Sequence, residues 1–190
     1  MSTSDSLVVA GLIERIGRLT RAREAAGGLN PAQWEALRYL SRANAFSRSP
    51  SAVADFLATT RGTVSQTLIA LEGKGLLRKS VSDRDRRGAT LDVTDAGLKL
   101  LRTLDPADDL VRALANLPPL HATLMAQALS RVLGALLEAR GGKAFGACAA
   151  CRNFARDAFP DGAGGPHRCG RFDAPLTAEE AALTCAAFEE

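Results

Sequence analysis

The chain concentrates all four of its cysteines at one end, and this asymmetry constrains its fold most strongly. Cys148, Cys151, Cys169 and Cys185 all lie within the last 43 of 190 residues. Four cysteines in a chain of this length are too few for a scaffold held together by disulfides. With 46% hydrophobic residues, the rest of the chain can bury an ordinary core. We therefore expect a globular body and, after it, a cysteine-bearing module.

The body has a helical pattern that is interrupted once by strands. Apolar residues at helical spacing and their flanking caps predict helices over residues 6–26, 31–43, 50–57 and 61–74. Alternating side chains then predict two strands, 76–81 and 89–94, which the charged loop 82–88 joins into a hairpin. Helices resume over 95–116, divided at Asp105-Pro106, and over 119–140. The predicted fold class is mainly α with a small β-hairpin wing.

Two short helices followed by a third helix and a basic hairpin form a winged helix-turn-helix. Once Val64, Leu68 and Leu71 of the third helix are buried, its outer face keeps small polar and basic side chains that suit base edges in the major groove. These residues are Arg61, Thr63, Ser65, Gln66 and Thr67. The hairpin tip adds Arg84, Arg86 and Arg87, which suit phosphates or a narrow minor groove.

Positive charge is concentrated in the same stretch. Residues 60–88 hold seven basic and three acidic side chains, a net charge of +4, whereas the whole chain has only +3. A charged run alone fits a solvated surface equally well. The ordered set of elements favours a DNA-binding face instead.

Residues 30–97 resemble the winged-helix core of the MarR family of bacterial transcription regulators. Six segments in the family's order carry the resemblance: NPAQW at 30–34, SAVA at 51–54, TVS at 63–65, LEGKGL at 71–76, DRR at 85–87 and LDVTDAG at 91–97. The resemblance implies a homodimer, formed by the N-terminal and late helices, on a palindromic operator in double-stranded DNA. It also implies that the helix from Arg61 reads the major groove while the wing at 85–87 touches the minor groove. Members are usually repressors that respond to a ligand or to oxidation.

These observations divide the chain into four parts. We expect an N-terminal dimerisation helix at 1–29, the DNA-binding core at 30–97, C-terminal dimerisation helices at 98–140 and a loop-rich cysteine module at 141–190. A final helix with a capping box is predicted to begin at Thr177, near the end of this module. The module departs from the usual family pattern.

The cysteines follow the spacing C-x2-C-x17-C-x15-C, which suggests ligands of one metal centre. The favoured interpretation is an iron–sulfur cluster, [4Fe–4S] or [2Fe–2S], held by all four thiolates. The first alternative is structural zinc bound by four cysteines, or by three with His167 as the fourth ligand. The second is a thiol switch that closes disulfides. Zinc sites usually pair two C-x2-C knuckles, and the single pair here favours the cluster.

We therefore expect a cytoplasmic, dimeric repressor whose cluster senses redox state, iron, oxygen or nitric oxide. In this hypothesis loss of the cluster reorganises the tail against the late dimer helices. The alternative is the same regulator with structural zinc and a small-molecule effector in the dimer cleft. A thiol redox enzyme is less favoured, because C-x2-C does not follow a strand in a βαβ unit. No segment predicts a signal peptide or a membrane span, since the longest uncharged stretch, 113–130, is polar and interrupted.

Overall fold

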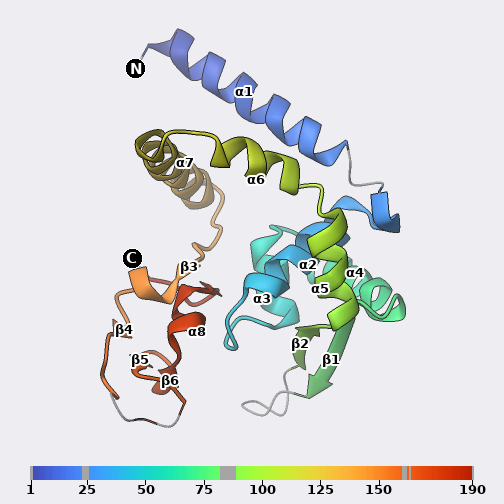
Figure 1. Ribbon diagram of the computed structural model, residues 1–190, viewed down its shortest axis with the longest axis vertical. Helices are drawn as coiled ribbons and strands as arrows, with labels where there is room; N and C mark the ends of the chain where they lie inside the picture. The colour runs from blue at the N-terminus through green and yellow to red at the C-terminus, as the bar shows by residue number, and fades with distance from the viewer. Residues whose placement is uncertain (1, 23–25, 82–88, 160–161, 163, 190) are drawn as a thin grey trace.

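The protein divides into three groups of elements, seen in a computed structural model that describes residues 2–22, 26–81, 89–159, 162 and 164–189. Three helices lie together along one side of the molecule (Figure 1). A helical body with a two-stranded hairpin occupies the centre and right of the view, and a small strand-rich module lies at the lower left. The second and third groups are in contact, and that contact positions the candidate site.

The central body is built from α2 (Pro31–Arg42), α3 (Pro50–Phe56) and α4 (Arg61–Gly73). Each helix begins at a side chain, Asn30, Ser49 or Thr60, that accepts a hydrogen bond from an otherwise unpaired N–H of the first turn. Between the helices lies a core whose largest fully buried members are Trp34, Leu37, Leu40, Val53, Val64, Leu71 and Leu91. The helix-turn-helix predicted from the sequence is confirmed.

The hairpin pairs β1 (Leu77–Val81) with β2 (Ala89–Val93) in antiparallel register. Leu77 lies opposite Val93, and Val81 lies opposite Ala89. Leu77 and Leu91 are buried against the helical core, while the rest of β1 is exposed. The hairpin is therefore a wing attached to the body along one edge, as predicted.

Helix α5 (Asp95–Leu104) belongs to the body. Its residues Leu100 and Leu101 pack against the helix-turn-helix core, although our predicted boundary at 97 gave residues 98–104 to the dimerisation helices. The first turn passes close to the hairpin at Gly97. A Cβ atom there would lie 2.4 Å from the Leu76 carbonyl oxygen and 2.8 Å from Val93 Cγ1. Only glycine permits this approach without a shift of the backbone.

Three helices lie outside the body: α1 (Thr3–Arg21), α6 (Asp108–Ala115) and α7 (Pro119–Ala139). The break predicted at Asp105-Pro106 is confirmed, and the short turn η1 (Ala26–Gly28) leads from α1 to the body. None of the residues described in these three helices is buried. Their large apolar side chains are exposed, including Leu7, Leu12, Ile16, Val111, Leu124, Leu129, Leu133 and Leu136.

In the described part of the chain, one helix, α7, is long and apolar enough to cross a membrane, judged by length and composition alone. We expected this region to be too polar for a membrane span, and that expectation considered only residues 113–130. The helix extends further, to Ala139, and gains Val132, Leu133, Leu136 and Leu137. Its apolar surface needs a partner of some kind.

The C-terminal module has more regular structure than predicted. One sheet pairs β3 (Gly146–Ala147) with β7 (Thr184–Cys185), and a second joins β4 (Phe154–Ala155), β5 (His167–Cys169) and β6 (Ala174–Leu176). A turn, η2 (Cys148–Ala150), and a helix, α8 (Ala178–Ala182), complete it. The capping box at Thr177 is confirmed: its side chain accepts from the Glu180 N–H, and the Glu180 side chain accepts from the Thr177 N–H.

The module packs against the loop between α2 and α3. Ala43 forms a β-bridge with Thr184, and the Phe46 and Phe172 rings stack with centroids 4.3 Å apart. Phe145 meets Tyr39 edge to face, with centroids 5.8 Å apart. Within this chain the module thus contacts the helix-turn-helix body, and the expected action of the tail on the late dimer helices stays a prediction. The aromatic side chains that decide the packing direction are spread over more than a hundred residues, so no local pattern indicated it.

The crossing of α5 and the hairpin at Gly97 yields a stability prediction. Replacing Gly97 by alanine forces the new Cβ into the Leu76 carbonyl, so we expect the free energy of unfolding to fall by about 1–3 kcal/mol. Urea denaturation at a fixed protein concentration measures it. Gly73→Ala is the matched control, because no heavy atom lies within 4 Å of its would-be Cβ. Equal stability of the two variants would contradict the prediction.

Candidate functional site

The outer face of α4 presents four of the five residues predicted to read DNA. Arg61, Thr63, Ser65 and Gln66 are exposed. Thr67 is only 8% exposed, and its hydroxyl donates a hydrogen bond to the Thr63 carbonyl oxygen at 3.0 Å. The prediction for Thr67 was wrong because position 67 belongs to the buried stripe of α4, together with 64, 68 and 71.

The hairpin lies beside this face and adds positive charge to it. Arg78 and Lys79 are exposed on β1, and a groove between α4 and the hairpin is lined by Arg61, Ser65 and Lys79 among others. We had counted Arg78 and Lys79 in the charge of the segment without assigning them to the site. The strand register could have indicated them, since only Leu77 of β1 faces the core. The wing residues Arg84, Arg86 and Arg87 lie outside the described residues.

The four cysteines, far apart in sequence, line one small cavity in the module. Cys148, Cys169 and Cys185 are buried and Cys151 is half-buried, and all four are free thiols. They come from separate elements: η2, the residue that follows it, the end of β5 and the end of β7. Phe154, Leu176 and Ala187 form much of the apolar wall.

Hydrogen bonds to sulfur shift the pKa values of two of these thiols in opposite directions. The Cys148 and Cys185 thiols are in hydrogen-bond contact, and this contact lowers the pKa of Cys185. The same contact, together with burial, raises the pKa of Cys148. Asn44 Nδ2 also donates a hydrogen bond to Cys148 Sγ at 3.2 Å.

His167, the alternative ligand, is engaged elsewhere. It is buried, and its Nδ1 accepts a hydrogen bond from the Asp157 N–H at 3.1 Å. Its ring meets Phe154 edge to face. His167 is not among the described residues that line the cysteine cavity. The geometry therefore supports four sulfur donors over three sulfurs and one imidazole.

The donor set fits a thiolate-bound metal in chemistry, and its members share one cavity. Soft thiolates select zinc, copper(I) or iron–sulfur clusters. As the side chains stand, however, no group of three or more His, Cys, Asp or Glu residues in the described ranges is arranged to hold a metal ion. The site would need to close its side chains around the metal.

Two residues that sequence reasoning did not find contact this module: Asn44 and Ser47, both in the loop between α2 and α3. Both are fully buried. Asn44 is 104 positions from the cysteine it contacts, and a single Asn in a polar loop has no periodicity that could have indicated this role.

Comparisons with known proteins agree with the fold. Residues 27–88 match the family model described as MarR family. No match was found among curated protein sequences.

Solved structures extend the similarity beyond the matched segment. The S. aureus MepR–DNA complex is 21% identical, covers 71% of this chain and 99% of its own, and has a TM-score of 0.54. CouR from Rhodococcus jostii RHA1, bound to p-coumaroyl-CoA, is 18% identical over 69% of this chain and 95% of its own, with a TM-score of 0.57. A MarR transcriptional regulator from Methanosarcina mazei Go1 is 16% identical over 72% and 99%, with a TM-score of 0.56. Residues 27–88 therefore match the MarR family model, and the chain has the winged helix-turn-helix fold of these solved structures.

Proposed function

We propose that the protein is a dimeric, sequence-specific DNA-binding transcription regulator, a repressor acting in the cytoplasm. The observation that carries the proposal is α4, which exposes Arg61, Ser65 and Gln66 over a buried apolar stripe and lies beside a basic hairpin. A helix of this kind fits the major groove, where side chains distinguish all four base pairs. The solved MepR–DNA complex has the same fold.

The two parts of the DNA-binding face have different tasks in this proposal. The helix α4 reads base edges, and the hairpin positions the protein through phosphates or the minor groove. Arg84, Arg86 and Arg87 at the hairpin tip take the second task, with Arg78 and Lys79 beside them. Charge confined to this surface explains how a chain with a net charge of only +3 binds a polyanion.

A second copy of the chain is the proposed partner of α1, α6 and α7. These helices expose large apolar side chains, a surface that soluble proteins cover. A membrane is a weaker explanation of α7, because Arg131 lies in the middle of the helix and a charge at the bilayer centre is costly. A two-fold dimer also places two α4 helices on a palindromic operator.

We further propose that the four thiols hold a metal whose occupancy controls DNA binding. Iron–sulfur remains a candidate by donor type. The direct contact between Cys148 and Cys185 supports a single zinc ion, since sulfurs about 2.3 Å from one tetrahedral metal lie about 3.8 Å apart. In a [4Fe–4S] cluster each thiolate binds a different iron atom, so the contact disfavours that cluster, whereas in a [2Fe–2S] cluster two thiolates share each iron. The burial of Cys148 disfavours thiol–disulfide catalysis, which needs an accessible nucleophile.

The DNA-reading role predicts that DNA affinity falls when a basic side chain of α4 is removed. Arg61→Ala should weaken binding about tenfold or more and reduce the salt dependence by about one ion, because one charged contact disappears. Binding is measured by fluorescence anisotropy on a duplex selected in vitro from random sequences. Arg42→Ala, at the exposed end of α2, is the matched control. Equal effects of both substitutions would contradict the role of α4.

The dimer predicts a change of mass on charging the apolar face. Leu133→Asp places a carboxylate in the proposed interface, so the protein should sediment as a single chain. Val81→Asp, which changes an exposed apolar residue on the hairpin, should leave the dimer intact. A wild-type protein that sediments as a single chain at micromolar concentration would refute the dimer.

The metal predicts a defined stoichiometry. Anaerobically purified protein should carry one zinc per chain by elemental analysis, and Cys148→Ser should lose most of it because one of four ligands is gone. His167→Gln should keep the metal, since His167 does not line the cavity. Iron with acid-labile sulfide would assign the cluster instead. Protein without either metal would end the metal proposal.

A further inference from the structure

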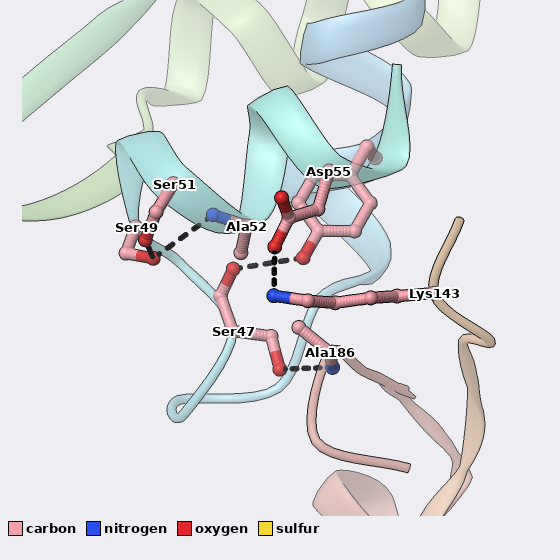
Figure 2. Close-up of polar contacts among 8 residues, drawn as sticks. Ser47, Ser49, Ser51, Ala52, Asp55, Lys143 and Ala186 are labelled. Atoms are coloured by element: carbon pink, nitrogen blue, oxygen red, sulfur yellow. Dashed lines mark hydrogen bonds and ion pairs between the residues drawn. The ribbon is translucent and has the colours of Figure 1, made fainter. Parts of the chain in front are cut away.

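The loop between α2 and α3, residues 43–48, forms hydrogen bonds with the module on both sides of Cys185. The Asn44 N–H donates to the Thr184 carbonyl oxygen at 2.9 Å. The Ala186 N–H donates to Ser47 Oγ at 2.8 Å, as Figure 2 shows. The two residues that flank one cysteine are thus held by one short loop of the DNA-binding body.

The same loop reaches a second cysteine through Asn44. Its side chain donates from Nδ2 to Cys148 Sγ and accepts at Oδ1 from the Ser47 hydroxyl at 2.7 Å and the Phe46 N–H at 3.1 Å. Asn44 is 0% exposed. A buried amide is stable only while its partners are in place. The conformation of the loop therefore depends on where the Cys148 sulfur lies.

At its other end the loop forms hydrogen bonds with the elements proposed to bind DNA. The Tyr39 hydroxyl of α2 donates to the Ser47 carbonyl oxygen at 2.9 Å, and the Leu91 N–H of β2 donates to the Arg48 carbonyl oxygen at 2.8 Å. Ser49, the next residue, caps α3 through the Ala52 N–H (Figure 2). The loop thus connects the cysteine cavity with α2, the start of α3 and the hairpin.

We propose that Asn44 and Ser47 relay the state of the thiol site to the DNA-binding body of the same protomer. When the thiols are gathered around a metal, the loop is held as described and α3 and β2 keep the positions that DNA binding requires. Without the metal, the Cys148 sulfur and residues 184–186 are held less firmly, so the hydrogen bonds of Asn44 and Ser47 open more often and DNA affinity falls. This inference rests on the proposed function, and it replaces control through the late dimer helices by a route within one protomer.

The first test separates the relay from the metal site. Wild type, Ser47→Ala and Ser41→Ala are compared with Zn²⁺ bound and after EDTA treatment under a reductant, on the in vitro selected duplex. Wild type should lose about tenfold in DNA affinity without Zn²⁺. Ser47→Ala should keep its Zn²⁺ but bind DNA weakly in both states. Ser41→Ala, whose hydroxyl donates to the nearby Arg38 carbonyl oxygen, should respond like wild type.

The second test uses a matched pair of amides near sulfur. Asn44→Asp keeps the acceptor for Ser47 but turns an oxygen toward Cys148, so Zn²⁺ affinity should fall about 10–100-fold and the DNA response should disappear at saturating Zn²⁺. Asn153 Nδ2 lies 4.0 Å from Cys151 Sγ within the module. Asn153→Asp should keep the full DNA response once Zn²⁺ saturates it.

Hydrogen exchange provides a readout that does not involve DNA. On removal of Zn²⁺ from wild type, the amides of Asn44 and Leu91 should exchange faster, and in Ser47→Ala they should be fast in both states. Unchanged exchange in wild type, or a wild-type DNA response in Ser47→Ala, would overturn the relay while leaving the proposed function intact. If no duplex is selected or no metal is retained, the proposed function itself fails and the relay fails with it.

Discussion

The arrangement of the cysteine module on the helical body depends on one buried amide. Asn44 uses every polar atom: its N–H and C=O bond to Thr184 and Ser47, its Nδ2 to Cys148 and its Oδ1 to Ser47 and Phe46. Burying this amide without its partners would lower the free energy of unfolding by about as much as several ordinary contacts add to it. The helical body and the cysteine module are therefore not two independent parts joined by a linker.

Apolar packing alone would join the two parts less specifically. The stacked rings of Phe46 and Phe172 and the edge contact of Tyr39 with Phe145 supply area, but such contacts tolerate sliding. The ion pair of Lys143 with Asp55 is largely exposed, so solvent screens it and it contributes little. Directional hydrogen bonds to buried atoms set the register between loop and module.

Features that depend on interactions between residues close together in the chain could be predicted from the sequence. Features that depend on contacts between distant residues could not. Helix starts at Asn30, Ser49, Thr60 and Thr177 were predictable because a capping side chain bonds an N–H three residues away. Thr67 was misplaced because its type is polar while its position on α4 is inward. The packing of Leu100 and Leu101 against the body was not predicted for a similar reason: α5 is amphipathic, and an apolar stripe does not show which surface will cover it. The two small sheets of the module were not predicted, since strands of two or three residues have no usable periodicity.

The sequence by itself determined the elements of the winged helix, the local concentration of positive charge and the number and type of sulfur donors. These are properties of short segments, where spacing, capping and composition act within a few residues. Only the tertiary structure decided that the four thiols share one cavity, that His167 faces away from it and that Asn44 links it to the DNA-binding body. Those outcomes depend on contacts between residues as many as 139 positions apart. Such contacts arise from the packing of the whole chain and leave no signal in any one segment.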